Sequence, residues 1–440
     1  MQTPILQQPI AASTTRSSFR AAAISSALEL LRTKFHPVSV PISRVQEKAN
    51  SSHHDELRHA HVKLDSRHYK TTSFVSRLLE CCRTLNVPRW SNNELAQDHV
   101  VVHKVSGSLT NAVFFVSCPT IRHAPTLLLR IYGPSSGILI SRSEELHTLH
   151  VLSSQFGIGP RVYGTFDNGR IEEYFDSTTL TPSDIRNPKI SRWIGARMAE
   201  LHSVDMSSVE TSSGKYCTTG ETSVQKNITA WLGSAQAVLA LPAVSQAIKR
   251  ALDLERFRDE WDKYMRWLSK VDDMNNGGQR VFAHNDAQYG NLLKLKRVER
   301  GLEEHHQIIV VDFEYAGPNA AAYDIANHFH EWTADYHSLT PHLLDLSKYP
   351  SIKERRNFYL AYLKQCRSSV EDLDGQASIT KLDEQVRYWS PASHAMWAIW
   401  GIVQAREDVE GNVEQPEFDY ISYAVCRMAA FRRELRALVL

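Results

Sequence analysis

The sequence of 440 residues has no hydrophobic run long enough to cross a membrane. Its aliphatic run 308–311, for example, has the length of a buried strand, whereas a membrane helix needs about 18 or more apolar residues. The chain also has no excess of charge, because 50 Lys and Arg residues balance 49 Asp and Glu residues. Without a strong electrostatic field, binding to nucleic acid or to an acidic membrane is not expected. We therefore predict a soluble protein that has no nucleic-acid partner.

Cysteine is scarce, and no CxxC pair indicates a zinc site or a redox motif. The six cysteines are Cys81, Cys82, Cys118, Cys217, Cys366 and Cys426. Such scattered residues fit reduced thiols better than a disulfide framework. This pattern favours a reducing compartment, and we expect a cytoplasmic protein.

Acidic residues are absent from the first 28 positions, where Ser, Thr and Ala are frequent and Arg16 and Arg20 occur. A mitochondrial transit peptide has this composition. Flexible N-terminal extensions have it as well, and the chain stays polar without a clear period up to about residue 65. We favour the second interpretation and predict a flexible extension over 1–65.

Strand and helix signals divide the rest of the chain into two parts. Short β-branched or aromatic runs, separated by turn residues, begin near residue 99 and indicate an antiparallel sheet. Apolar residues at helical spacing dominate after residue 176. Strands are expected at 100–102, 112–116, 127–132, 162–166 and 170–175, and helices at 73–82, 141–152, 190–202, 254–268, 355–366, 392–405 and 420–438. We predict an α+β protein with a small β-rich N-lobe at 66–176 and a larger, mainly helical C-lobe at 177–440.

The segment 282–293 and the strand end near Asp312 carry the most informative pattern. Asp286 is followed five residues later by Asn291, which places a carboxylate and an amide oxygen on one loop. Magnesium prefers a few such oxygen ligands together with phosphate oxygens. Asn291 and Asp312 can hold the metal on ATP, while Asp286 accepts the proton of an attacking hydroxyl. The pattern predicts phosphoryl transfer.

Two upstream features fit this chemistry, although each alone is equally an ordinary structural feature. Backbone N–H groups and hydroxyls of a turn with small residues can surround phosphate oxygens. This turn contains Ser106, Gly107, Ser108, Leu109, Thr110 and Asn111. Arg130 lies in an apolar strand and needs a partner, which either a phosphate or Glu145 on the next helix could supply. The combination with the downstream motif favours an ATP site.

These motifs resemble the choline/ethanolamine kinase family, a relative of protein kinases and aminoglycoside phosphotransferases, and the choline kinase branch is the more similar. The similarity covers 99–431. It is carried by 106–111, 128–133, Gly159-Pro160 with Tyr163-Gly164, His284-Asn285-Asp286 to Asn291, 312–316, 324–329 and Glu331-Trp332. The resemblance implies a protein-kinase-like fold of two lobes. A homodimer is compatible with it, although the sequence alone does not give the oligomeric state.

The resemblance also implies ATP and Mg²⁺ as cofactors and a small amino alcohol as the phosphate acceptor. Arg130 would bind ATP and pair with Glu145, and Gln288 would contact the nucleotide. The hinge beside adenine would consist of Glu173, Tyr174 and Phe175. The cationic head of the acceptor would lie among Asp286, Glu331, Tyr336, Trp397, Trp400 and Tyr423. Independently, Trp397 and Trp400 are one helical turn apart and share a side, and indole faces attract quaternary ammonium groups, although such a pair is also common in helix cores.

Two positions depart from the family pattern. Gly107-Ser108 stands where relatives commonly have Gly-Gly, so the phosphate turn gains stiffness or a hydroxyl donor. Ser390-Pro391 interrupts what is often one long helix, and we interpret the pair as a new N-cap and first turn before the tryptophan helix.

The function implied is ATP-dependent phosphorylation of choline to phosphocholine, the first step of phosphatidylcholine synthesis by the CDP-choline route. Ethanolamine kinase or a dual kinase is the alternative, because a primary ammonium can use the same carboxylates. A metal-dependent hydrolase using His284, Asp286, Asp312 and Glu314 is more remote, since the phosphate turn argues against it. An inactive kinase-like scaffold would be expected to lack Asp286, Asn291 or Asp312, and all three are present.

Overall fold

The computed structural model forms two compact units. It describes residues 57–91, 95–107, 111–121, 123–132, 142–209, 221–272, 280–297, 301–366, 375–411 and 418–438. Of these, the first unit contains 57–132 and 163–174, and the second contains 142–162 and 175–438. Most of the predicted extension 1–65 lies outside the described residues. Its described part, 57–65, belongs to the first unit, where Ala60, Val62 and Leu64 are buried in the core.

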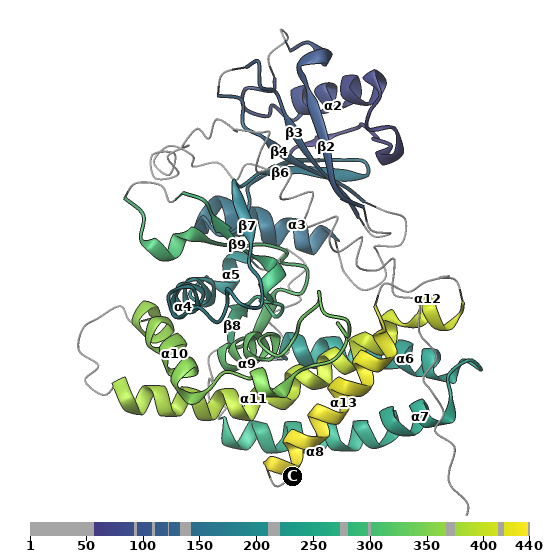
Figure 1. Cartoon of the computed structure of the whole chain (residues 1–440), viewed down its shortest axis with the longest axis vertical. Coiled ribbons are helices and arrows are strands. Elements are labelled where there is room, and N and C mark those ends of the chain that lie inside the picture. Colours follow the sequence, from purple (N-terminus) through teal and green to yellow (C-terminus); the bar gives the residue numbers. More distant parts are fainter. Residues whose placement is uncertain are drawn as a thin grey trace, which may run out of the picture. The chain divides into compact units, whose positions relative to one another are not determined.

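A six-stranded sheet forms the first unit (Figure 1). Strands β2 to β4 and β6 pair antiparallel, as predicted, whereas the short β1 adds a parallel pairing with β5 at one edge. In sheet order the strands are β1 His59–Ala60, β5 Val162–Phe166, β6 Gly169–Glu173, β4 Leu127–Tyr132, β3 Asn111–Ser117 and β2 Val101–Gly107. Burial alternates along β4, so its buried residues all project from one face of the sheet. This face forms one side of the core of the unit.

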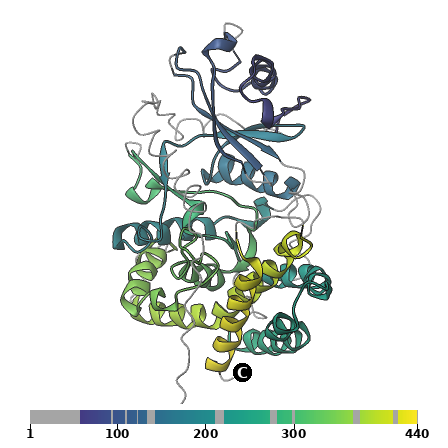
Figure 2. The same ribbon diagram turned by 45° about the vertical axis from the view of Figure 1, so that its right-hand side comes forward.

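The core of this unit lies between the sheet and helix α2 (Thr72–Thr84), which Figure 2 shows beside the strands. The Thr71 side chain caps the helix by accepting the Phe74 N–H, and the apolar face that follows is buried. Phe74 and Leu78 join Phe114 and Leu129 of the sheet in one cluster. The helix predicted at 73–82 is therefore confirmed.

The second unit is mainly helical. Its helices are α3 Arg142–Val151, α4 Pro188–His202, α5 Met206–Val209, α6 Ser223–Ala240, α7 Gln246–Leu252, α8 Leu254–Val271, α9 Ala321–Glu331, α10 Ile352–Cys366, α11 Gly375–Gln404, α12 Arg406–Val409 and α13 Tyr420–Ala437. The predicted helices are present, although the one expected at 392–405 is only the second half of α11. Helices α5, α6, α7, α9 and α12 were not predicted. Helices α6, α9 and α13 all pack against α11, which makes α11 the centre of this unit (Figures 1 and 2).

Two small sheets position the loops of the second unit. Strand β9 (Leu292–Leu295) lies between β7 (Ser177–Thr179) and β10 (Ile308–Val310). Strand β8 (Arg280–Ala283) pairs antiparallel with β11 (Gly317–Ala320). The loop that carries Asp286 and Asn291 therefore runs from one small sheet to the other.

The prediction that a new helix starts at Ser390-Pro391 was wrong, because Pro391 lies inside the single helix α11. Ser390 does not cap a helix; its hydroxyl instead contacts His330 Nε2 at 2.9 Å. Proline removes one backbone hydrogen bond, but the neighbouring residues Trp389 and Ala392 are fully buried. Packing on several sides holds the helix through the proline.

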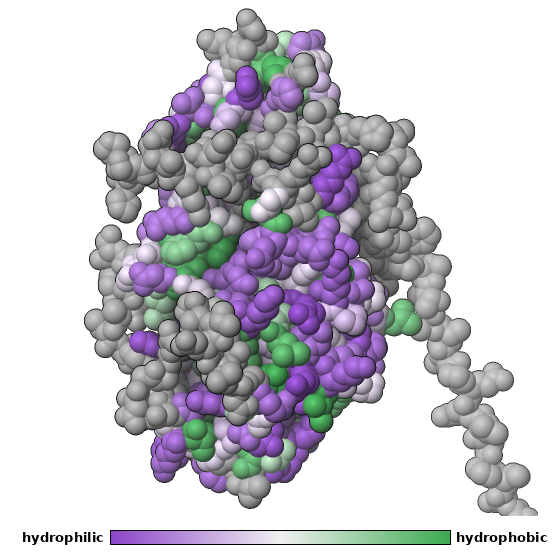
Figure 3. Space-filling view, turned by 90° about the vertical axis from the view of Figure 1, so that its left-hand side faces the viewer, coloured by the Kyte–Doolittle hydropathy of each residue, from purple (hydrophilic) through white to green (hydrophobic). Residues whose placement is uncertain are grey.

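No helix in the described part of the chain is long and apolar enough to span a membrane. Among the coloured residues in Figure 3, hydrophilic ones predominate and hydrophobic ones lie in small groups.

Candidate active site

A buried carboxylate on α9 holds the loop that follows β8. Asp324 accepts the backbone N–H groups of His284 (2.9 Å) and Asn285 (2.8 Å), and His202 Nε2 lies 3.0 Å from the same carboxylate. Burial alone would raise the pKa of Asp324, but the hydrogen bond and charge of His202, with His284, lower it. An ionised Asp324 thus fixes the start of the loop, where Asn285 takes a left-handed backbone conformation (φ 63°).

The His284 imidazole uses both of its nitrogens within the protein. Nε2 lies 3.1 Å from the Val311 carbonyl, and Nδ1 lies 3.2 Å from the Asp286 N–H. Burial lowers the pKa of His284, so a neutral ring donates from Nε2 and accepts at Nδ1. His284 is therefore structural, and the alternative role as a ligand of a hydrolase metal is not supported.

Amide side chains form a second set of hydrogen bonds that hold the loop. Asn285 Nδ2 donates to the Tyr315 carbonyl (2.8 Å), and Asn319 Nδ2 donates to Asn285 Oδ1 (2.9 Å). Asn327 Nδ2 donates to the Asn285 carbonyl at 3.1 Å. Because these groups are buried and satisfied, the loop has one strongly preferred geometry.

The three residues predicted to carry the chemistry lie together. Asn291 Nδ2 donates to Asp286 Oδ2 (2.8 Å) and to the Asp286 carbonyl (3.0 Å). The Val311 N–H donates to the Asn291 carbonyl at 3.0 Å, which brings the end of β10 and Asp312 beside Asn291. Asp312 itself has a left-handed backbone (φ 68°). Two left-handed turns thus direct Asp286 and Asp312 into one region.

Negative charge accumulates around Asp286. Burial, followed by the charges of Glu331, Asp312 and Glu314, raises the pKa of Asp286 well above its usual range. Such a cluster of carboxylates favours a bound cation, and a base near the acceptor benefits from a raised pKa.

Asn291 and Asp312 fit a divalent cation with oxygen ligands. The amide nitrogen of Asn291 is used by Asp286, whereas Asn291 Oδ1 has only a long contact, 3.5 Å, with Gln288 Nε2 among the described residues. The Asp312 carboxylate forms no hydrogen bond or ion pair within the described part of the chain. Both oxygens are therefore available for a hard cation.

The predicted acceptor residues form a second connected group in the same unit. Glu331 accepts from Arg427 Nη2 (2.9 Å) and from the Tyr336 hydroxyl (2.7 Å). Arg427 Nε in turn donates to the Tyr423 hydroxyl at 3.0 Å. Arg427 is fully buried, and its positive charge balances Glu331.

Both tryptophans of α11 are anchored by their indole N–H groups. Trp397 Nε1 donates to Asn327 Oδ1 (2.7 Å), and Trp400 Nε1 donates to the Tyr315 hydroxyl (2.8 Å). The two indoles meet edge to face, with centroids 5.3 Å apart, and Trp400 makes a similar contact with Tyr423. Asn327 thus connects the aromatic group to the catalytic loop.

The predicted phosphate turn joins β2 to β3 in the first unit. Ser106 and Gly107 end β2 and Asn111 begins β3, whereas Ser108, Leu109 and Thr110 lie outside the described residues. A register shift in β2 between Lys104 and Ser106 precedes the turn.

Arg130 lies on β4 beside a carboxylate that the sequence did not single out. Its Nε is 4.0 Å from the Glu172 carboxylate, which also pairs with Arg170. Burial alone would raise the pKa of Glu172, but the two guanidinium groups lower it. Glu145 is on α3 in the second unit, so its pairing with Arg130 stays a prediction.

The other predicted nucleotide residues are at the end of β6 and on the catalytic loop. Glu173 ends β6 and Tyr174 packs on Phe115, with centroids 4.8 Å apart. The first unit ends at Tyr174, and the second resumes at Phe175. Gln288 accepts the Gly290 N–H at 2.8 Å and so shapes the loop.

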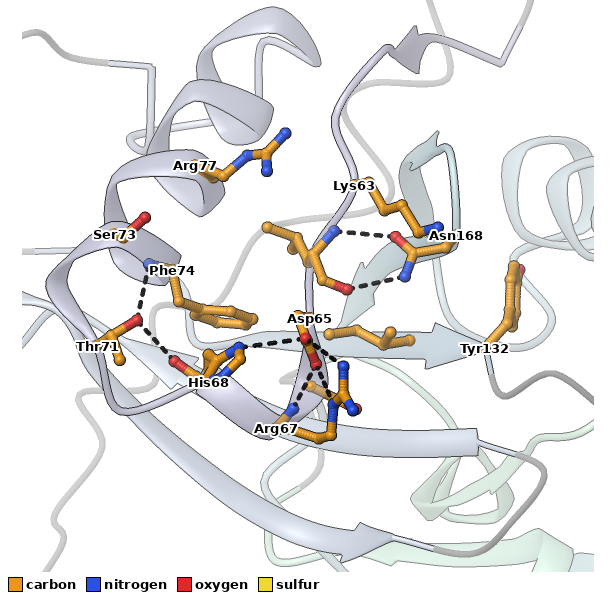
Figure 4. A pocket seen from close by; sticks show the side chains of 13 residues that line it. Lys63, Asp65, Arg67, His68, Thr71, Ser73, Phe74, Arg77, Tyr132 and Asn168 are labelled. Atoms are coloured by element: carbon orange, nitrogen blue, oxygen red, sulfur yellow. Dashed lines mark hydrogen bonds and ion pairs between the residues drawn. The ribbon is translucent and has the colours of Figure 1, made fainter.

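A hollow of about 990 Å³ in the first unit is separate from these residues (Figure 4). Lys63, Arg67 and Arg77 lie along its wall, and Arg67 is paired with Asp65. It contains none of the predicted site residues.

Sequence reasoning did not assign roles to Asp324, Asn327, Arg427 or Glu172. Asp324 and Asn327 lie in the segment 324–329, which was used only for its resemblance to the kinase family. Arg427 could have been recognised as a paired residue, because it is a cation among apolar residues on α13. A cation at such a position requires a buried partner.

Comparison with known proteins identifies the family of this chain. The family model described as choline/ethanolamine kinase matches residues 102–432. A choline kinase from Schizosaccharomyces pombe is 35% identical over 80% of this chain and 86% of its own length, and an ethanolamine kinase from Saccharomyces cerevisiae is 28% identical over 80% and 67%. The crystal structure of a choline kinase from Cryptosporidium parvum, 24% identical, has the same fold, with a TM-score of 0.66 over 83% of this chain and 96% of that one. The chain belongs to the choline/ethanolamine kinase family.

Proposed function

We propose that this protein transfers the γ-phosphoryl group of ATP to the hydroxyl of choline, forming phosphocholine and ADP. The observation that carries the proposal is the group of Asp286, Asn291 and Asp312 on loops held by buried hydrogen bonds. The similarity to choline kinases exceeds that to the ethanolamine kinase described above, which supports choline as the acceptor.

Asp286 is assigned as the base. The choline O–H bond gives its proton to the Asp286 carboxylate, the oxygen forms a bond to the γ-phosphorus, and the bond to the ADP oxygen breaks. The raised pKa of Asp286 supports this role, because a carboxylate with a higher pKa is a stronger base. The hydrogen bond from Asn291 keeps the carboxylate in one orientation.

Mg²⁺ is assigned as the cation, with Asn291 and Asp312 as its protein ligands. Bound Mg²⁺ would neutralise the phosphate charge that develops during transfer. The free oxygens of these two residues support the assignment. Backbone N–H groups of the turn 106–111 and the guanidinium of Arg130 are assigned to the phosphates.

The acceptor head is assigned to the aromatic group around Trp397, Trp400 and Tyr423. A trimethylammonium group cannot donate N–H hydrogen bonds, so aromatic faces suit it better than further acceptors. The edge-to-face arrangement and the two anchored N–H groups support this assignment, since they fix the ring planes.

Ethanolamine is the second candidate acceptor. Glu331 is buried close enough to raise the pKa of Asp286, and a primary ammonium could use both carboxylates. However, Arg427 already balances the charge of Glu331, which favours a cation held by aromatic faces over one held by ion pairs.

The direct test uses the purified full-length chain with ATP, Mg²⁺ and either choline or ethanolamine, with ADP and the phosphorylated product both measured. We expect one phosphocholine for each ADP and a higher kcat/KM for choline. ADP release without a phosphorylated acceptor would indicate a hydrolase, and absence of ADP release would indicate a scaffold.

A further inference from the structure

Two histidines and an aspartate converge on the outer side of the β1–β5 pair, in the first unit. His59 is paired with Thr165 and Ala60 with Phe166. Since successive strand residues face opposite sides, Ala60 and Phe166 enter the core. The outer side consequently carries His59 and Thr165 and, two residues further along each strand direction, His61 and Asp167.

The three ligand-type atoms lie close to the spacing of a tetrahedral metal site. Asp167 Oδ1 lies 3.4 Å from His59 Nε2 and 3.7 Å from His61 Nδ1, and all three atoms lie within 4.8 Å of one another. Ligands bound to zinc at about 2.0 Å in tetrahedral geometry are about 3.3 Å apart. The His61 side chain is 92% exposed, so it can rotate to close the remaining gap.

The surroundings orient these ligands. His59 Nδ1 lies 2.9 Å from Thr165 Oγ1; when this nitrogen donates its hydrogen, the lone pair of Nε2 points toward Asp167. Such an outer hydrogen bond is typical of histidine ligands. The Asn168 amide, next to Asp167, bonds both the N–H and the carbonyl of Leu64 at 3.0 and 2.8 Å, as the dashed lines in Figure 4 show.

Charge distinguishes this cluster from two similar ones among the described residues. In the cluster of Glu200, His305 and His306, the carboxylate is already paired with Arg197. In the cluster of His330, His394 and Glu434, Arg427 Nη1 lies 3.4 Å from His394 Nδ1.

Asp167, by contrast, forms ion pairs with histidines alone in the described part of the chain. A divalent cation would therefore meet no competing guanidinium there.

We propose that His59, His61 and Asp167 form a binding site for a divalent transition-metal cation of the Zn²⁺ type, with water in the fourth position. Two neutral imidazoles and one carboxylate are ligands that such ions prefer over Mg²⁺. The bound ion would fasten the two-residue edge strand β1 to the β5–β6 turn. None of its three residues is among the predicted catalytic, nucleotide-binding or acceptor residues.

The test is a Zn²⁺ titration of the full-length, tag-free chain by calorimetry, with Mg²⁺ in excess to occupy oxygen-rich sites. We expect His61→Ala and Asp167→Asn to weaken the tightest Zn²⁺ site at least about tenfold, and Thr165→Val, which removes only the orienting hydroxyl, to weaken it about tenfold. His103→Ala, on the opposite edge strand β2, is the matched control and should bind as the wild type does.

Hydrogen exchange supplies a second readout. Zn²⁺ should slow exchange over 57–64 in the wild type and in His103→Ala, and should leave it unchanged in Asp167→Asn. Co²⁺ should give the visible absorption of a tetrahedral site in the same variants that bind Zn²⁺ tightly. Equal Zn²⁺ affinity in all variants, or tight binding without slower exchange over 57–64, would overturn the proposal.

Discussion

The catalytic loop and the acceptor group are both held by hydrogen bonds, with α9 contributing to each, but the acceptor group is built mainly of aromatic rings. Asp324 and Asn327 fix the loop through buried hydrogen bonds to its backbone. Around Glu331, aromatic rings meet edge to face beside one ion pair. Buried hydrogen bonds fix one geometry of the loop, whereas π faces attract a cation more strongly when more of them lie close to it. We infer that the loop determines the chemistry and the aromatic group selects the substrate.

The largest effect is expected at Asp286. Asp286→Asn should lower kcat about a hundredfold or more for choline and ethanolamine alike, because both need the same base. Thermal unfolding and ATP binding should remain near wild type, and Asp335→Asn provides a control outside the loop. A well-folded variant with near-normal turnover would remove Asp286 from this role.

A smaller effect is expected at Asp312. Asp312→Asn suits the left-handed backbone but removes a charged metal ligand, so half-maximal activity should require about tenfold more Mg²⁺ or higher. The KM for choline should change little. An unchanged Mg²⁺ requirement would place the metal ligand elsewhere.

Substitutions in the acceptor group should change the KM moderately, and by different factors for the two substrates. Trp400→Leu keeps an apolar side chain but removes most of the π face, a loss of about 1 to 2 kcal/mol, which would raise the KM for choline roughly five- to thirtyfold. The KM for ethanolamine should rise less, and ATP affinity should not change. Trp193→Leu on α4 is the matched control. Equal weakening of both acceptors would identify Trp400 as core packing.

The smallest effect concerns acid stability, where α9 again provides a contrast. His328 bonds through both nitrogens, whereas His330 Nδ1 is buried without a hydrogen-bond partner in the described structure. Burial, with the nearby charges of His394 and Arg427, lowers the pKa of His330 well below its usual range, although Glu434 opposes this.

Below about pH 6.5 the unfolded chain therefore binds a proton that folded His330 does not. The free energy of unfolding consequently decreases as the pH is lowered. His330→Gln should reduce that fall by up to about 1.4 kcal/mol per pH unit, as measured by urea unfolding between pH 7 and 5. The exposed His337→Gln serves as the control. An unchanged slope in His330→Gln would mean that folded His330 takes up the proton.

Local patterns predicted the parts of the molecule that depend on local structure. The apolar run 127–132 between turn residues predicted the strand β4, whose burial alternates in the structure. The spacing of Asp286 and Asn291 predicted that both lie on one loop, where their side chains are 2.8 Å apart. In both cases the neighbours that decide the structure are close in sequence.

Long-range contacts explain what was missed. Asp324 acts on a loop about 40 residues away, and Arg427 pairs with Glu331 across 96 residues. Pro391 was interpreted by its local propensity, but helices α6, α9 and α13 pack around α11 and hold it intact. Spacing along the chain does not reveal which distant residues become partners.

One competition assay tests the central claim most directly. Equal concentrations of choline and ethanolamine are offered with ATP and Mg²⁺, and the ratio of phosphocholine to phosphoethanolamine gives the ratio of the two kcat/KM values. We predict that phosphocholine predominates and that Asp286→Asn slows both products without changing the ratio. Trp400→Leu should shift the ratio toward phosphoethanolamine, by at most about five- to thirtyfold, because the KM for ethanolamine rises less than that for choline. A ratio that changes in Asp286→Asn, or that stays constant in Trp400→Leu, would contradict the division between chemistry and selection.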